Sequence, residues 1–248
     1  MPKIEFKPMS LEDNIEIVRW CYKDKNEDKL LDTHRFCLNL FPELKDIPDS
    51  FSEEEVDKYI GKVVSKYYNE RLDIINESIK RYNDVWKKYN DDFFKELCSY
   101  LEIDWPEDKE IIEATIGIIP VSPRNIDEFS FSTHENITDN QLIETCAHEC
   151  CHFLWFEKWK ELYPDYKTED FEAPSNIWEY SEMIVDPILN SDKIAKVFNK
   201  KTRYAYDSFY ENDSIMNGLF EIFNDDLSID EKIVKGFEYI NKIKTKSI

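Results

Sequence analysis

The stretch Thr138–Phe156, which reads TDNQLIETCAHECCHFLWF, decides the fold around it. Thr138 and Gln141 have the spacing of a capping box, in which two side chains bond to free backbone N–H groups of the first helical turn. The apolar run that follows predicts a helix that is packed on most of its sides. In this helix His148 and His152 lie four residues apart, so their side chains project from one face, about one turn apart.

Residues 148–152, HECCH, form an HExxH motif. Two imidazoles at this spacing can bind one metal ion, and zinc is favoured because neutral imidazole is a good donor for it. Glu149 lies beside the same face, where it can act as general base toward a zinc-activated water. The chain has only four histidines, so the chance of this motif is on the order of one in a hundred. The motif predicts one zinc ion per chain, with His148 and His152 as ligands and Glu149 as the catalytic base.

The third zinc ligand has to come from another part of the chain. His152 is the last histidine, so a carboxylate is the expected type of ligand. The segment 175–186, SNIWEYSEMIVD, predicts a helix that is apolar except for an acidic stripe, which is costly to bury unless it meets a cation. The stripe consists of Glu179, Glu182 and Asp186. Glu179 also has a structural interpretation, since it stands at capping-box spacing from Asn176.

The motif and the ExxxD spacing of Glu182 and Asp186 resemble the gluzincin branch of the HExxH zinc metallopeptidases, or zincins. That branch includes thermolysin-like proteases and zinc aminopeptidases. The resemblance implies that Glu182 is the third zinc ligand and that Asp186 accepts a hydrogen bond from a ligand histidine. Glu179 stays the alternative ligand. The resemblance also implies a zincin-like fold and hydrolysis of peptide bonds in a peptide or protein substrate.

The resemblance covers Ala114 to Ile188, and the sequence departs from the family in several places. Ser181 stands where thermolysin-like enzymes have Asn, and the gap after His152 is longer than theirs. A GxMEN-type aminopeptidase signature is absent. Trp155 and Lys158 occupy the positions of the Gly and the last His in the longer metzincin motif. The family's pattern is therefore matched in the five-residue motif and, more weakly, in the later acids.

Two further sets of side chains bear on the chemistry. A tetrahedral oxyanion needs a donor besides the metal, commonly Tyr, His or Arg in this family. The candidates are Tyr204, Tyr206, Tyr210, Arg203 and His134. Three cysteines surround the motif, namely Cys146, Cys150 and Cys151; they offer an alternative metal site, but burial in the core is the interpretation that we favour.

The rest of the chain predicts an α+β protein that is mostly α-helical. Helices are expected over residues 10–22, 28–41 and 52–100, with a break near 90–92, and again from residue 175 through the C-terminal part. ATIGIIPV (114–121) and EFSFST (128–133) predict a hairpin in a small antiparallel sheet. We expect one zincin-like unit over 1–248, made of a helical part (1–105), a motif-bearing core (106–190) and a second helical part (191–248).

Charge and hydropathy limit the partners. The net charge of −21 argues against a nucleic-acid partner. The sequence lacks the roughly 18 apolar residues of a membrane span and an apolar N-terminal leader, and its six cysteines form no CxxC pair, so we expect a cytoplasmic protein without a membrane partner. A coiled-coil rhythm from Leu72 to Phe93 leaves monomer and dimer open.

Two other classes of function stay open beside the peptidase. One is a zincin-fold zinc-binding protein without catalytic activity. The other is a partner-binding or regulatory protein that acts through its helical N-terminal half, with a structural zinc site. A structural site would be closed by four protein ligands, whereas a catalytic site keeps one position open.

Overall fold

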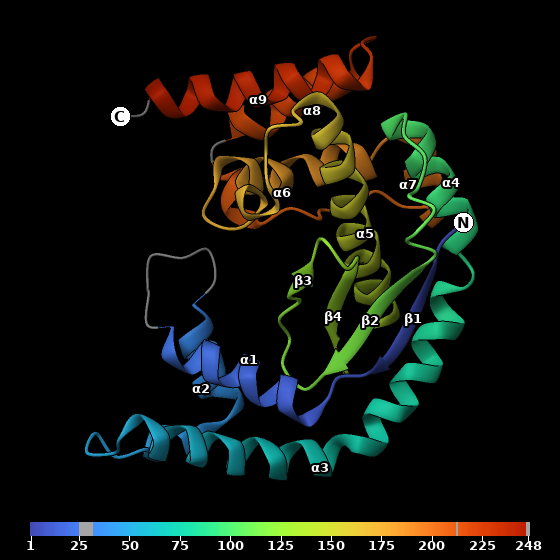
Figure 1. Cartoon of the computed structure of the whole chain (residues 1–248). Coiled ribbons are helices and arrows are strands. Elements are labelled where there is room, and N and C mark those ends of the chain that lie inside the picture. The colour runs from blue at the N-terminus through green and yellow to red at the C-terminus, as the bar shows by residue number, and fades with distance from the viewer. Residues whose placement is uncertain (25–31, 212, 247–248) are drawn as a thin grey trace.

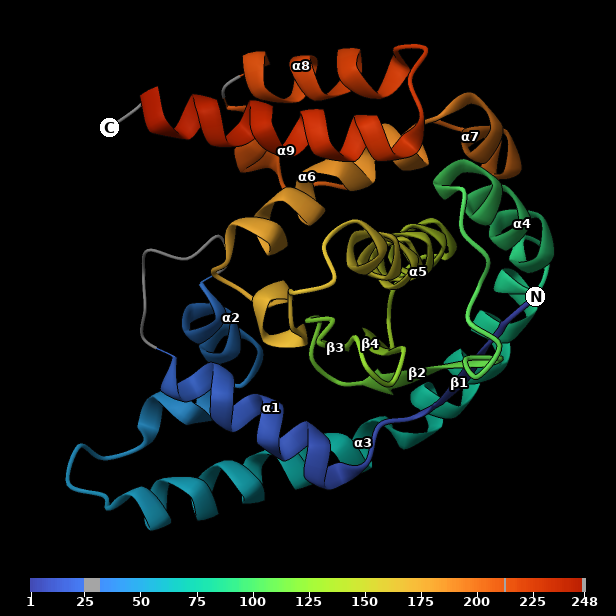
Figure 2. The same ribbon diagram turned by 45° about the horizontal axis from the view of Figure 1, so that its top comes forward.

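The computed structural model describes residues 1–24, 32–211 and 213–246. It is a mostly helical α+β structure around one four-stranded mixed sheet (Figure 1). The sheet lies between two long helices, α3 (Glu53–Trp86) and α5 (Asp139–Leu162), and α6 (Asn176–Leu189) lies on the far side of α5 (Figure 2). The α+β, mostly helical class expected from the sequence is confirmed.

The sheet has the strand order β1-β2-β4-β3. Its strands are β1 (Lys3–Pro8), β2 (Ile111–Gly117), β3 (Arg124–Asn125) and β4 (Ser130–His134). β1 pairs with β2 and β2 with β4 in parallel, in the registers Lys3 with Ile111 and Glu113 with Ser130. β3 pairs antiparallel with β4, with Arg124 opposite Phe131. The short β3 therefore forms one edge of the sheet.

The expected hairpin between residues 114–121 and 128–133 is wrong, and so is the purely antiparallel sheet. The two segments do pair, but as the parallel strands β2 and β4. Parallel neighbours need a crossover connection of about a dozen residues. Residues 118–129 supply it, and they bury Ile118, Ile119 and Ile126 along the way. β1 was not expected, although the alternation of buried Ile4 and Phe6 is the signal of a half-buried strand.

The N-terminal helices begin largely where the sequence predicts. Ser10 caps α1 (Leu11–Lys23) through the Asp13 N–H, and Ser52 with Glu55 forms the capping box of α3. The expected helix 28–41 is represented by α2 (Thr33–Leu40), and residues 28–31 lie outside the described residues. α3 ends at Trp86 and α4 (Asn90–Leu101) follows, which confirms the break.

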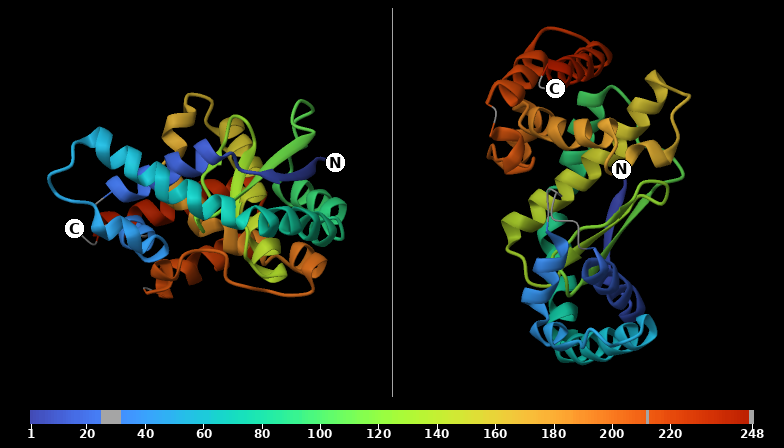
Figure 3. Two further views of the ribbon diagram at one scale, coloured as in Figure 1. Left: turned by 90° about the horizontal axis from the view of Figure 1, so that it is seen from below. Right: turned by 90° about the vertical axis from the view of Figure 1, so that its left-hand side faces the viewer.

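The long helix α3 runs along the sheet and packs within its own chain (Figure 3). Its buried residues include Ile60, Val64, Ile75 and Tyr82, and the Tyr82 ring contacts Phe6 of β1. The chain itself thus covers most of the apolar face of α3, as expected of two helices packed on the rest of the protein, whereas Leu72 and Ile74 are exposed.

The C-terminal part is helical, as expected. It contains α7 (Asp192–Phe198), α8 (Asp213–Asn224) and α9 (Ile229–Lys246), and α8 and α9 pack on α6 at the end of the molecule away from the sheet (Figure 1). Short 3-10 turns lie at Pro42–Asp46, Thr168–Phe171 and Asp207–Tyr210. Among the described residues, every helix is too short or too polar to cross a bilayer.

Candidate metal centre

Helix α5 carries the HExxH motif and is buried almost throughout. The capping box of Thr138 and Gln141 starts the helix, as the sequence predicts. Cys146, Cys150 and Cys151 are fully buried, which confirms their place in the core. Since apolar side chains surround the helix, it is fixed on both sides, between the sheet and α6.

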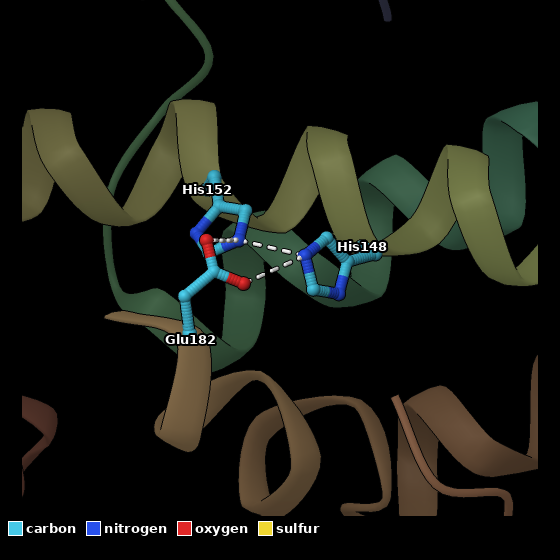
Figure 4. Close-up of side chains that lie close together, drawn as sticks. All are labelled: His148, His152 and Glu182. Carbon is cyan, nitrogen blue, oxygen red and sulfur yellow. Dashed lines mark hydrogen bonds and ion pairs between the residues drawn. The ribbon is translucent and has the colours of Figure 1, made fainter. Parts of the chain in front are cut away.

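The two histidines of the motif point to one place. The Nε2 atoms of His148 and His152 lie 2.9 Å apart, and the two ring centroids lie 4.5 Å apart with the planes nearly perpendicular (Figure 4). The His152 ring is fully buried and stacks on Phe156, one helical turn later. This packing holds the His152 ring in its orientation.

Glu182 on α6 completes the group. Its Oε2 lies 3.2 Å from Nε2 of His148, and its Oε1 lies 3.4 Å from Nε2 of His152 (Figure 4). Tetrahedral zinc with bonds of about 2.0–2.2 Å places its ligand atoms roughly 3.3 Å apart. The 2.9 Å between the two nitrogens, and the 3.2 and 3.4 Å from each nitrogen to its nearer Glu182 oxygen, are close to this spacing, so the three side chains could hold a zinc ion between them.

The structure distinguishes between Glu182 and Glu179, the two acids considered as third ligand. The group of closely spaced metal-type donors found in the described ranges consists of His148, His152 and Glu182, and does not include Glu179. The capping-box interpretation of Asn176 with Glu179 is wrong, because Ser175 caps α6 and accepts from the Trp178 N–H.

The electrostatic environment shifts the pKa values of the two histidine rings in opposite directions. Burial, together with the charge of Arg124, lowers the pKa of His152 to about 3, so this ring is neutral. Burial alone would lower the pKa of His148, but its hydrogen bond to Glu182 raises that pKa above the usual value. Burial would raise the pKa of Glu182, but the two histidines hold it well below the usual range. A neutral imidazole and an ionised carboxylate are the forms that bind a metal.

Glu149 lies next to this group and is 5% exposed. Its Oε2 is 3.9 Å from Nη1 of Arg124 and has no hydrogen-bond partner among the described residues. Burial raises the pKa of the Glu149 carboxyl, although His148 and Arg124 oppose the change. A buried carboxylate in this state is suited to accepting a proton.

Arg124 is a residue of the site that the sequence did not point to. It comes from the edge strand β3, and its Nη1 lies 3.0 Å from Oε1 of Glu182. Burial would lower the pKa of Arg124, but Glu182 and Glu149 raise it, so the guanidinium stays charged. A signal existed, since Arg124 is the only arginine in residues 106–190, a segment rich in acids that the fold buries.

Asp186 is fully buried, but its contacts differ from those that the resemblance implies. Its Oδ1 accepts from the backbone N–H groups of Tyr204 (2.5 Å) and Ala205 (3.3 Å), and its Oδ2 accepts from the hydroxyl of Tyr210. These bonds fasten the segment after α7 to α6. The role of acceptor from a ligand histidine is without support in these contacts.

The five expected oxyanion donors lie in different environments. Tyr206 lines the cavity at the metal centre, where burial, then Glu182 and Glu149, raise its pKa to about 12. Tyr204 lines the same cavity with a buried hydroxyl, whereas the Tyr210 hydroxyl is bound to Asp186. Arg203 pairs with Asp207. His134 lies beside Glu135, which is bound by Arg71.

Two cavities meet at these side chains. The smaller, of about 430 Å³, is lined by His148, Glu149, Glu182, Arg124, Tyr204 and Tyr206, among others. The larger, of about 630 Å³, extends toward α1 and is lined by Ile17, Trp20, Val121 and Trp178, together with Arg124, Glu182 and Tyr206. The candidate metal centre is thus accessible from a cleft that has one polar and one mainly apolar part.

Comparison of the chain with protein-family models, with curated proteins and with solved structures finds no match in any of the three. A function for this chain therefore has to be inferred from its own residues.

Proposed function

We propose that the protein is a zinc-dependent metallopeptidase of the gluzincin type. The observation that carries the proposal is the meeting of His148 and His152 with Glu182, with donor atoms 2.9–3.4 Å apart, beside a buried Glu149 and a cavity of about 430 Å³. Three protein ligands with an accessible fourth position are typical of catalytic zinc, whereas structural zinc has four protein ligands.

Each side chain at the centre has a part in this reaction. Zinc held by the two histidines and Glu182 would supply a Lewis acid that lowers the pKa of water and polarises a carbonyl. Glu149 accepts a proton from the attacking water and passes it to the leaving amine. Tyr206 is the donor that we assign to the developing oxyanion, since it lines the cavity beside Glu149, whereas the Tyr210 hydroxyl is bound to Asp186 and Arg203 pairs with Asp207.

The sheet offers a support for an extended substrate. β3 is the edge strand next to the centre, and it carries Arg124. A peptide can add to such an edge through backbone hydrogen bonds, while its side chains enter neighbouring pockets.

Two alternative proposals are an inactive zinc-binding protein and a helical partner-binding protein. Both differ from the peptidase proposal in that they give Glu149 no role. A zinc site with a structural role does not need an additional buried carboxylate beside its ligands. Within the described part of the chain, Oε2 of Glu149 is buried without a hydrogen-bond partner, which costs free energy of folding and favours a role in the reaction.

The test is the substitution Glu149→Gln, which keeps the shape of the side chain and removes its basicity. We expect the zinc content to stay at one per chain and the hydrolysis of fluorescently labelled casein to fall by at least 100-fold. Glu157→Gln is the matched control, because Glu157 lies on the same helix and pairs with Lys160. Hydrolysis that survives Glu149→Gln would contradict the assignment, and a wild-type protein that binds zinc but cleaves nothing would favour the inactive alternative.

A further inference from the structure

We propose that Arg124 binds a carboxylate group of the substrate through the edge of its guanidinium formed by Nε and Nη2. This inference rests on the proposed function, because it concerns the substrate of the same centre. It would make the protein selective for peptides that present a carboxylate next to the bond that is cleaved.

The orientation of the guanidinium is the first argument. Its Nη1 is used within the protein, at 3.0 Å from Oε1 of Glu182 and 3.9 Å from Oε2 of Glu149. Its Nε and Nη2 are buried and have no hydrogen-bond partner among the described residues, and the side chain is only 10% exposed. Unpaired buried donors are rare in folded proteins. These two N–H groups point in parallel from one edge, which matches the two oxygens of a carboxylate.

The position of Arg124 is the second argument. It lines both cavities and contacts Glu182, so a carboxylate bound to Arg124 would be close to the metal centre and within reach of the larger cavity. Ile17 and Trp20 of α1 and Trp178 of α6 give the larger cavity an apolar wall, and Trp20 is 54% exposed. A residue with a large apolar side chain and a free α-carboxylate would contact both features, whereas an Asp or Glu side chain would use only the guanidinium.

The charge of the centre is the third argument. With a divalent cation on neutral histidines, the ion and Arg124 carry three positive charges against the two negative charges of Glu149 and Glu182. One further negative charge balances the centre, which fits a carboxylate. Glu16 and Glu172 also line the larger cavity and are exposed to water, which screens them. Glu172 adds to the raised pKa of Arg124, but less than Glu182 and Glu149 do.

Fluorescence provides a test that does not depend on hydrolysis, because Trp20 and Trp178 line the larger cavity. The zinc-loaded protein is titrated with N-acetylphenylalanine and with N-acetylphenylalaninamide. We expect the acid to bind roughly tenfold or more tightly than the amide, as a charge-assisted bidentate pair implies. Equal affinities would overturn the proposal. N-acetylaspartic acid α-amide distinguishes the two sources, and it binds as tightly as the acid only if a side-chain carboxylate is recognised.

Variants assign the preference to Arg124. In Arg124→Gln the affinities for acid and amide should converge, while Arg81→Gln, which removes a surface charge on α3, should leave the preference unchanged. Arg124→Lys keeps a charge for Glu182 without the two parallel donors, so it should retain zinc and lose most of the preference. A full preference in zinc-loaded Arg124→Lys would overturn the proposal. A wild-type protein without zinc affinity would instead contradict the proposed function, so the two failures differ in their readout.

Discussion

Glu182 is the residue on which the candidate metal centre depends most, because it joins both histidines and Arg124. Its two carboxylate oxygens lie 3.2 and 3.4 Å from the two ring nitrogens, and one of them also accepts from Arg124. It is the only negatively charged member of the donor group found in the described ranges. The affinity of the centre for a cation should therefore follow this side chain.

Glu182→Ala should reduce zinc affinity by more than 100-fold, since loss of a ligand costs more than the 10–100-fold typical of an outer contact. Glu179→Ala, one turn earlier on α6, is the matched control and should bind zinc like the wild type. Zinc content and a competition titration with a chelator measure both. The opposite pattern, with Glu179→Ala losing zinc, would assign the third ligand to Glu179.

The protonation of His148 predicts how zinc affinity depends on pH. Because its pKa is raised above 6.5, zinc has to displace a proton from this ring below that pKa. Affinity should be highest at pH 8 and should fall by about tenfold per pH unit once the pH drops below the raised pKa. Calorimetric titrations in two buffers of different ionisation enthalpy report the released proton. An affinity that is constant between pH 8 and 6 would be inconsistent with this state.

The sequence predicted some residues of the centre and missed one, for a physical reason. The positions of His148, Glu149 and His152 on one helix follow from helix periodicity. This is a local pattern, so it can be recognised in the sequence. Arg124 contacts Glu182, which is 58 positions away in the chain, through the pairing of β3 with β4. Such a contact depends on how the strands pair and not on the spacing of residues along the chain. The excess of buried acids was therefore the only signal in the sequence that could have indicated the role of Arg124.

At the level of elements, α6 and the segment 199–210 act together. Asp186 receives two backbone N–H groups and one hydroxyl from this segment, which also carries Tyr206 into the cavity. The helix thus provides a predicted metal ligand and, one turn later, the anchor of the segment beside it. The ExxxD spacing is used here for anchoring and not for a histidine contact.

Asp186→Asn should lower the free energy of unfolding by about 1–3 kcal/mol, because buried hydrogen bonds to a charged group are lost. Zinc affinity should change little. Urea unfolding and a zinc titration measure the two quantities, and Tyr210→Phe, which removes one of the three donors, should give a smaller loss of stability. A 10–100-fold loss of zinc affinity at unchanged stability would instead support the role implied by the gluzincin resemblance.

The elements show the same division between local and distant signals. Capping boxes at Ser52 and Thr138 predicted where α3 and α5 begin, since the bonds involved lie within one turn. The direction of the strands was not predictable in this way. β2 and β4 are close in sequence but parallel, because residues 118–129, which bury Ile118, Ile119 and Ile126, lead the chain across before it returns.

In the whole molecule the candidate metal centre lies between two layers. His148 and His152 belong to α5, which packs on the sheet, and Glu182 belongs to α6, which carries α8 and α9 (Figure 2). A metal ion bound to all three side chains would join these layers. The large buried core makes the fold independent of that ion, so the ion should add stability and not create it.

Zinc at 100 times its dissociation constant should raise the free energy of unfolding by about 2.7 kcal/mol, which for this chain length corresponds to about 5–10 °C in Tm. Differential scanning calorimetry with zinc and with EDTA measures the difference. In Glu182→Ala the difference should be close to zero. A protein that is unfolded in EDTA would show that its core is insufficient without the ion.

The brevity of β3 has a consequence for how the chain tolerates insertions and deletions. Arg124 and Asn125 are neighbours in a two-residue strand, and neighbouring side chains of a strand leave it on opposite sides. The register of β3 on β4 is set by the turn of residues 126–129 that joins them. Deleting one residue from this turn would move Arg124 into the register position of Asn125 and turn its side chain to the other face of the sheet, away from Glu182.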